Sequence, residues 1–354
     1  MTVTTSVRGL QTLGQIIKSV RFHGPDDLRL DEVVAREPGP CEARIRPLAC
    51  GLCGTDQHIL HGDFPAASPV ILGHEVAGVV DALGDGFTGL KEGDLVSVQP
   101  NTYCGMCLHC RAGREHLCSR LRAYGVHLDG GFSEAMVAKA SALYRLPNGT
   151  NPQIGCLAEP LACCIHGIDR AGIRSGSRVF VIGAGLIGLM LTRLARLAGA
   201  GLIVVGEPQQ TRRAQAIEFG ADKTLDSTSA DGEAAAMVDS NAEGFDLVID
   251  AVGSRGSFEQ AVRIAARGGS ILVFGVAAPS TISSVSPFDI YARELTILGS
   301  FINPYTHERA ISLLPQMHLE KLRINRFSMA SYREAFRAQS SSTDSAKVVI
   351  LPQE

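Results

Sequence analysis

A glycine-rich turn between an apolar run and a helix-like segment constrains this chain more than any other feature. The apolar run spans residues 178–182, and a GxGxxG pattern follows it directly. The residues of this pattern expected to contact a ligand or set the turn are Gly183, Gly185, Leu186, Ile187 and Gly188. The pattern predicts a tight turn at Gly183, a close backbone approach to a pyrophosphate at Gly185 and close helix–strand packing at Gly188. The helix opening at Leu186 would point its free N–H groups at that anion.

An acidic residue follows at the end of the next apolar run. Glu207 comes after the run 202–205 and could accept hydrogen bonds from the ribose hydroxyls of a dinucleotide. A carboxylate there would repel a 2′-phosphate, which favours NAD. Arg212 and Arg213 lie close behind, however, and either could pair with a phosphate. We therefore expect a dinucleotide site for NAD, with NADP as the open alternative.

The surrounding segments alternate between apolar runs and helical spacing. Strands are predicted at 177–182, 202–205, 223–225, 245–252, 270–275 and 295–300, and helices at 186–197, 211–219 and 258–266. This alternation is typical of a doubly wound parallel sheet and places the chain in the α/β class. Residues 16–146 instead read as short strands broken by Gly, Pro and Asp, which indicates a β-rich, barrel-like unit. The tail predicts a helix at 307–314 and a strand at 347–351.

Length and charge narrow the class of protein. A chain of 354 residues suggests about two domains. The net charge of −3 argues against a nucleic-acid partner, because nucleic-acid-binding proteins usually carry a positively charged surface. The N-terminus lacks a signal-peptide pattern, and no apolar stretch is long enough to span a membrane. A cytoplasmic protein without a membrane partner is expected, with residues 1–13 as a loosely attached extension.

Four cysteines stand close together with regular spacing. They are Cys104, Cys107, Cys110 and Cys118. Two-residue gaps let successive thiolates converge on one ion, and four thiolates close a tetrahedral zinc shell, so the site is structural. A bacterial iron–sulfur signature would have a last gap of about three residues followed by Pro. Here the last gap is seven residues and Ser119 follows, which favours zinc over an iron–sulfur cluster.

A second, open metal site is suggested by scattered residues. Cys53 lies within Gly51–Asp56, and His74 and Glu75 follow Gly73. One Cys, one His and one carboxylate make a plausible zinc shell with room for water or substrate. Taken alone, the same residues could be a small buried thiol and a histidine bonded within the core.

These motifs together resemble the zinc-containing medium-chain dehydrogenase/reductase superfamily. The matching pieces run in the family's order: Gly51–Asp56 with His58, Gly73–Glu75 with Gly78, the four-cysteine lobe, Glu159–Leu161 and Gly183–Gly188. They span roughly residues 16–351. The resemblance implies a GroES-like catalytic domain with both zinc sites (1–160 and 302–354) and a Rossmann cofactor domain (161–301). It also implies an active site in the cleft between them and a homodimer or homotetramer.

Within the superfamily, Leu157–Leu161 is similar to the polyol (sorbitol-type) and threonine dehydrogenases. Liver- and yeast-type alcohol dehydrogenases carry a cysteine zinc ligand in place of Glu159. Gly299–Pro304 also looks like the polyol branch. The resemblance leaves open whether Glu75 or Glu159 is the direct zinc ligand. Two neighbouring cysteines are expected to be small core residues: Cys163 and Cys164.

The resemblance implies oxidation of a secondary alcohol, foremost a polyol, to the ketone. Zinc would lower the pKa of the substrate hydroxyl, and the nicotinamide would accept hydride. Thr55 and His58 match the family's proton-relay positions, and the near-neutral pKa of histidine suits that role. Asp56 could fix the tautomer of His74, or it could be a simple turn residue.

Other functions remain as alternatives at this level. The substrate could be L-threonine or a simple secondary alcohol. A zinc-free reductase of the superfamily would generally lack both the cysteine lobe and the Cys/His/Glu set. A non-catalytic dinucleotide-binding protein is disfavoured by the presence of Thr55 and His58. The apolar run 295–298 could be an exposed edge that pairs across a subunit interface, or an internal strand.

Overall fold

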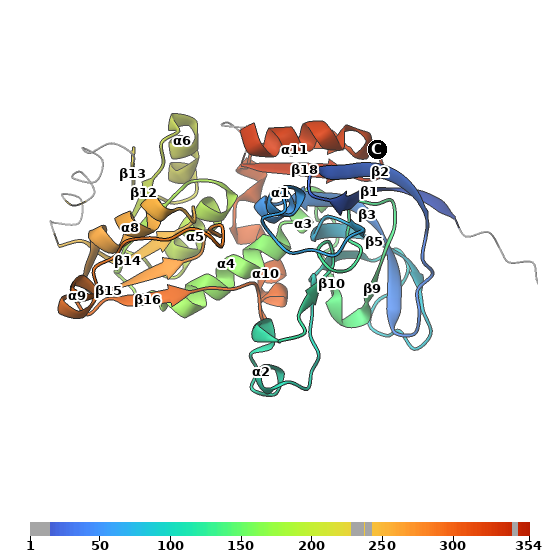
Figure 1. Cartoon of the computed structure of the whole chain (residues 1–354), viewed down its shortest axis with the longest axis horizontal. Helices are drawn as coiled ribbons and strands as arrows, with labels where there is room; N and C mark the ends of the chain where they lie inside the picture. The colour runs from blue at the N-terminus through green and yellow to red at the C-terminus, as the bar shows by residue number, and fades with distance from the viewer. Residues whose placement is uncertain (1–14, 228–236, 238–242, 342–345) are drawn as a thin grey trace, which may run out of the picture.

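The computed structural model describes residues 15–227, 237, 243–341 and 346–354. The predicted N-terminal extension lies outside these residues. Figure 1 shows a parallel sheet with its helices at one end of the molecule and a β-rich part at the other. Helices α4 (Ala158–Ala171) and α10 (His307–Leu313) lie between the two parts (Figure 1).

The parallel sheet has six strands in the order β13-β12-β11-β14-β15-β16. Their bounds are β11 Arg178–Ile182, β12 Leu202–Gly206, β13 Lys223–Leu225, β14 Phe245–Asp250, β15 Ala265–Val273 and β16 Thr296–Gly299. The helices associated with it are α5 Leu186–Leu197, α6 Gln210–Glu218, α8 Arg255–Ile264 and α9 Pro287–Ala292. The strand order reverses between β11 and β14, and ligands of doubly wound sheets bind outside the carboxyl ends at such a point. The predicted doubly wound α/β sheet is confirmed.

One helix and the strand after it differ from the sequence expectation. The helix expected at 258–266 begins earlier, because Ser254 caps it by accepting the N–H of Ser257, and it ends at Ile264. Strand β15 then starts at Ala265, ahead of its expected first residue.

Helix α4 was not anticipated, although it lies beside the predicted site. Pro160 and Gly167 read as helix breakers, but proline is tolerated in the first turn of a helix. Gly172, at φ 62°, ends the helix in the left-handed conformation that glycine adopts most readily. The expected domain boundary after residue 160 falls inside this helix.

In the β-rich part the central strand is β3 (Glu42–Leu52), which pairs with β5, β9 and β18. The other strands are β1 Ile16–Gly24, β2 Asp27–Val34, β4 Val70–Ile71, β5 Glu75–Leu83, β6 Leu95–Val98, β7 Asn101–Thr102, β8 Arg122–Ala123, β9 Met136–Lys139, β10 Leu143–Arg145, β17 Ile324–Ser328 and β18 Lys347–Leu351. Short helices are α1 Gly54–Leu60, α2 Leu108–Arg111 and α3 Pro152–Gly155. The pairing of β18 with β3 returns the end of the chain to its beginning, as the red strand among the blue ones shows (Figure 1).

One buried apolar cluster joins the two parts. It includes Leu161 of α4, Leu189 of α5, Ala310 of α10 and Val349 of β18. Helix α4 packs against both α5 and α10. The position of Glu159 in the first turn of α4 is therefore fixed by a core that both parts share.

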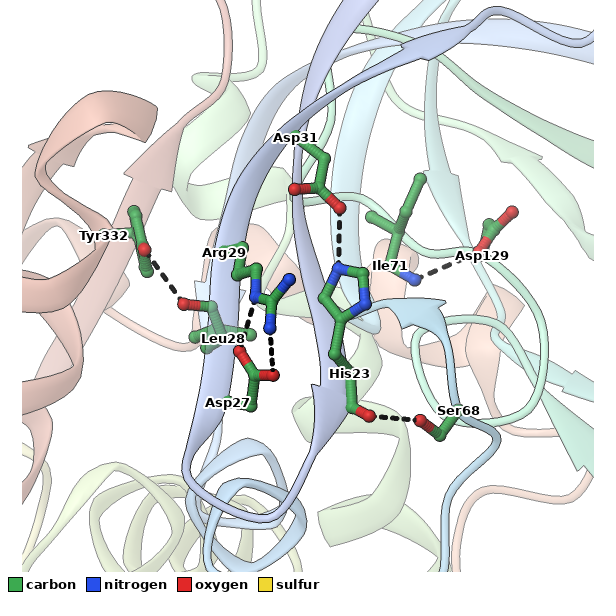
Figure 2. Close-up of polar contacts among 9 residues, drawn as sticks. All are labelled: His23, Asp27, Leu28, Arg29, Asp31, Ser68, Ile71, Asp129 and Tyr332. Atoms are coloured by element: carbon green, nitrogen blue, oxygen red, sulfur yellow. Dashed lines mark hydrogen bonds and ion pairs between the residues drawn. The ribbon is translucent and has the colours of Figure 1, made fainter.

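The C-terminal helix α11 (Tyr332–Ser341) is tied to the β1–β2 hairpin. The Tyr332 hydroxyl donates to the Leu28 carbonyl at 3.0 Å, and Figure 2 shows this contact beside the other polar contacts of the hairpin. Within the hairpin, His23 Nε2 lies 2.7 Å from the Asp31 carboxylate, and Arg29 pairs with Asp27 (Figure 2). The Tyr332 bond holds a C-terminal segment, which the sequence left unassigned, against the N-terminal strands.

Strand β16 is the last strand of the parallel sheet, and Ile297 on it is exposed. The apolar run there is thus an edge rather than an internal strand, and pairing across a subunit interface stays a prediction. Among the described helices, none is long and apolar enough to cross a lipid bilayer.

Candidate active site

Strand pairing brings three of the predicted metal ligands together. Cys53 immediately precedes α1 and follows β3, while Glu75 begins β5 and His74 directly precedes it. The register pairs Gly51 with Glu75 across the two strands. One ligand atom from each of Cys53, His74 and Glu75 lies within 4.8 Å of the other two. Ligands of one tetrahedral zinc are about 3.3–3.8 Å apart, so this sulfur, nitrogen and oxygen set fits a zinc ion.

Asp56 contacts two of these three residues, Cys53 and His74. It is fully buried, and its Oδ2 accepts the Cys53 backbone N–H at 2.9 Å. Its Oδ1 lies 3.6 Å from Nδ1 of His74, which leaves Nε2 as the ring nitrogen for a metal. Burial lowers the pKa of His74, but Asp56 and Cys53 outweigh it and raise that pKa well above its ordinary value. Surroundings that stabilise an imidazolium also stabilise a metal cation.

A buried lysine that the sequence analysis missed pairs with Glu75. Lys347 Nζ lies 2.5 and 2.7 Å from the two carboxylate oxygens, and the side chains are only 4% and 2% exposed. A Cβ at position 51 would lie 2.0 Å from Glu75 Oε2, so Gly51 makes room for the pair. Burial lowers the pKa of the Lys347 ammonium, but Glu75 offsets this and the pKa is raised. A lysine at the start of an apolar strand looks like an exposed strand end, and no signal in the sequence marked it.

Glu159 lies outside the group formed by Cys53, His74 and Glu75. It is buried in the first turn of α4, and its Oε1 accepts from Asn303 Nδ2 at 3.1 Å and from Cys163 Sγ at 3.5 Å. Burial raises the pKa of Glu159 to about 7, although His74 opposes the rise.

The two cysteines that follow Glu159 differ in their surroundings. Cys164 is a buried core residue, as expected. Cys163 is only partly buried, and its contact with Glu159 makes it more than a core filler.

The two predicted relay residues stand one turn apart on α1. Thr55 Oγ1 lies 3.7 Å from Cys53 Sγ. His58 Nδ1 lies 3.9 Å from an Asp63 carboxylate oxygen, and its side chain is 37% exposed. Residues three apart on a helix share a face. Thr55 therefore lies beside Cys53, and His58 lies nearer to solvent on the same side of α1.

The four-cysteine lobe is compact and presents all its sulfurs inward. Cys110 Sγ lies 3.9 Å from Cys104 Sγ and 3.5 Å from Cys107 Sγ, and with Cys118 they form one group. Four thiolates around one zinc are about 3.8 Å apart, so the lobe fits a closed zinc shell. Backbone N–H groups of Met106 and Cys107 lower the pKa of Cys104 to about 6, which favours the thiolate that binds metal.

The glycine turn has the geometry that dinucleotide binding needs. Gly183 has φ +95°, and a Cβ at Gly188 would lie 1.9 Å from the Gly183 carbonyl oxygen. A Cβ at Gly185 would meet nothing within 4 Å, so the space beside it is open. Leu186 and Ile187 begin α5 directly after this space. The turn sits at the carboxyl end of β11, beside the reversal of strand order.

Glu207 closes the turn from the neighbouring strand. Its Oε2 accepts the Ala184 N–H at 2.9 Å, and its Oε1 accepts the Gln209 N–H at 3.0 Å. Arg213 donates to the backbone carbonyls of Glu207 and Pro208, so its guanidinium braces this loop. Arg212 lies on α6. The Glu207 carboxylate is therefore held in place at the carboxyl end of β12, beside the glycine turn.

Two family models match the chain. The alcohol dehydrogenase GroES-like domain matches residues 39–148, and the zinc-binding dehydrogenase domain matches residues 187–316. Curated relatives include D-arabinitol dehydrogenase 1 of Uromyces fabae, 30% identical over 97% of this chain and 99% of that protein. D-altritol 5-dehydrogenase of Agrobacterium fabrum is 38% identical over 77% of this chain and 80% of that protein.

A solved structure is similar throughout. A protein of Sinorhizobium meliloti 1021, provisionally assigned as a zinc-binding dehydrogenase and bound to NADP, superposes with a TM-score of 0.92. It is 38% identical, and the match covers 96% of this chain and 100% of that chain. The chain is therefore an oxidoreductase that belongs to the zinc-binding medium-chain alcohol dehydrogenase family.

Proposed function

We propose that this dehydrogenase oxidises a secondary hydroxyl of a polyol to the ketone, with NAD as the preferred acceptor. The observation that carries the proposal is the convergence of Cys53, His74 and Glu75 into one metal-sized group. The arabinitol and altritol dehydrogenases among its relatives act on polyols, which supports that substrate class. L-Threonine and simple secondary alcohols are the alternative substrates.

Each part of the site has a distinct task in this reaction. When bound, zinc supplies a Lewis acid for the substrate hydroxyl, and the nicotinamide supplies a hydride acceptor. Cys53 and His74, with Glu75 or Glu159, would hold the catalytic zinc, and the four-cysteine lobe would hold a structural one. The Thr55 hydroxyl takes the substrate proton as it releases its own, and His58 passes the released proton to solvent. Asp56 keeps His74 oriented through its 3.6 Å contact.

The proposed domain division follows from the same arrangement. We assign residues 1–160 and 302–354 to the catalytic domain and 161–301 to the cofactor domain. The pairing of β18 with β3 supports the return of the C-terminal segment to the catalytic domain. The exclusively parallel pairing of β11 to β16 supports the cofactor domain.

Turnover on a panel of alcohols tests the proposal. The zinc-loaded protein is mixed with NAD or NADP and with sugar alcohols, L-threonine, 2,3-butanediol or a simple secondary alcohol, and reduced-cofactor absorbance is followed. We expect turnover of a sugar alcohol that a chelator abolishes. Preferred turnover of L-threonine or a simple alcohol would replace the polyol assignment. No turnover, with zinc and dinucleotide both bound, would overturn the proposed function.

The preference for NAD is tested by Glu207→Ser. We expect this change to raise kcat/KM with NADP relative to NAD by about 10- to 100-fold, because a hydrogen bond to a charged group contributes about 1.5–3 kcal/mol. The ratio of the two dissociation constants, measured by fluorescence titration, should move in the same direction. Glu218→Ser on the exposed side of α6 is the control and should leave the ratio unchanged. An unchanged ratio in Glu207→Ser would remove Glu207 from cofactor selection.

A further inference from the structure

Glu159 is held by a chain of two buried asparagine amides from distant parts of the sequence. Asn303 is fully buried, and its Nδ2 donates to Glu159 Oε1 at 3.1 Å. Asn101, on β7 and only 8% exposed, donates from its Nδ2 to Asn303 Oδ1 at 2.8 Å. These two hydrogen-bonded amides therefore connect the base of the cysteine lobe to the Glu159 carboxylate beside the metal site.

The chemistry of the two partners fixes which way the Asn303 amide faces. The carboxylate of Glu159 can only accept when ionised, and the Asn101 amide nitrogen can only donate. Rotating the Asn303 amide by half a turn would set oxygen against oxygen and N–H against N–H. With Glu159 ionised, only the observed orientation satisfies both neighbours: the Asn303 nitrogen faces Glu159, and the Asn303 oxygen is held by the Asn101 amide.

Within the described part of the chain, the hydrogen bonds to Glu159 occupy its Oε1 and leave its Oε2 without a donor. Oε1 accepts from both Asn303 and Cys163. Among the residues that the structure describes, none makes a hydrogen bond to Oε2. A carboxylate oxygen with two donors has little capacity for a metal or a water, so the second oxygen is the one that remains available.

The backbone around Asn303 indicates that its position is imposed. Ile302 has φ +47° and Tyr305 has φ +59°, both in the left-handed region. A β-branched residue such as Ile302 rarely adopts that conformation. Thr306, three residues after Asn303, donates to the Ala162 carbonyl of α4 at 2.7 Å, a bond that involves neither Asn303 nor Glu159.

We propose that Asn303 is a positioning residue that holds Glu159 by Oε1 and thereby presents Oε2 to the catalytic metal or to a water beside it. This inference deepens the proposed function and rests on it. Asn101 acts one step further away by fixing the Asn303 amide. A buried amide with a purely structural role would affect stability without affecting the metal.

The test compares two changes in the same loop. Asn303→Leu keeps the approximate side-chain size and removes both hydrogen bonds, while Thr306→Val removes the neighbouring buried bond to α4. Partners of metal-ligating groups typically contribute 10- to 100-fold in metal affinity or activity. We therefore expect Asn303→Leu to release the catalytic zinc to a chromogenic chelator about 10- to 100-fold faster and to lower kcat by a similar factor. Thr306→Val should change thermal stability alone.

Three features keep the experiment decisive. The zinc of the cysteine lobe serves as an internal reference, because its release rate should not change. Asn101→Leu leaves Asn303 in place but free to rotate, so it should shift zinc release and kcat in the same direction by several-fold, and it decides the matter if Asn303→Leu does not fold. Zinc release needs no substrate, so it still reports on Asn303 if the alcohol panel fails. Release and kcat in both asparagine variants matching those of Thr306→Val would overturn the proposal.

Discussion

Replacing Cys53 by alanine is expected to abolish turnover while leaving dinucleotide binding intact. Cys53 supplies the only sulfur of the group that it forms with His74 and Glu75. Two remaining donors do not make a stable zinc site, because catalytic zinc sites generally use three protein ligands. Metal stabilisation of the developing charge contributes several kcal/mol, so kcat should fall by at least about a thousandfold.

The separation of the two effects follows from the fold. The glycine turn at Gly183–Gly188 belongs to the parallel sheet, whereas Cys53 belongs to the β3–α1 connection of the other part. Zinc content per chain should therefore fall by about one ion, and the dissociation constant for NAD should change little. Elemental analysis, steady-state kinetics and fluorescence titration measure the three quantities.

A matched control distinguishes the loss of a ligand from the loss of a thiol. Cys41 is exposed and lies outside both metal groups, so Cys41→Ala should keep full zinc content and activity. Activity retained in Cys53→Ala with normal zinc content would remove Cys53 from the catalytic site.

The features closest together in the sequence were the ones that the sequence predicted best. Spacing alone predicts the geometry of the four-cysteine lobe and of the glycine turn, since at most 14 residues separate the parts of either one. The alternation of apolar runs likewise predicted the parallel sheet, and β13 and β18 have the predicted bounds. Sequence signals over short stretches were sufficient because each of these units is formed by residues that lie close together in the sequence.

The group formed by Cys53, His74 and Glu75 depends on tertiary structure instead. The pairing of Gly51 with Glu75 brings Cys53 to His74, and no spacing rule encodes that register. The resemblance to a family supplied the three residues as a set. It also supplied Glu159, yet not the helix that carries it, because Pro160 and Gly167 concealed α4.

Residues that support the predicted ligands could not be found from the sequence. Lys347 and Asn303 come from the last quarter of the chain and reach Glu75 and Glu159 only after the C-terminal segment has folded back. Their hydrogen-bond partners are distant in sequence, and their residue types are usual on protein surfaces. Burial, which is a property of the whole fold, gives them their roles.

Lys347→Met is expected to lower the stability of the fold strongly, because it removes one partner of a buried ion pair. The substitution keeps a long side chain but leaves the Glu75 carboxylate buried at 2% exposure without its cation. Removing one partner of a buried ion pair typically lowers the free energy of unfolding by about 3–5 kcal/mol. Denaturant unfolding of the zinc-depleted protein measures this loss apart from any contact that the freed carboxylate makes with the metal.

Two comparisons show whether the uncompensated charge is the cause. Arg36→Met breaks the exposed pair with Glu42, in which the Arg36 side chain is 60% exposed, and should change stability by about 1 kcal/mol or less. The double variant Glu75→Gln/Lys347→Met leaves no charge to bury, so it should recover most of the stability that Lys347→Met loses. If the double variant were no more stable than Lys347→Met, the loss would come from packing around the lysine stem, and the ion pair would not be what links the start of β5 to β18 across β3.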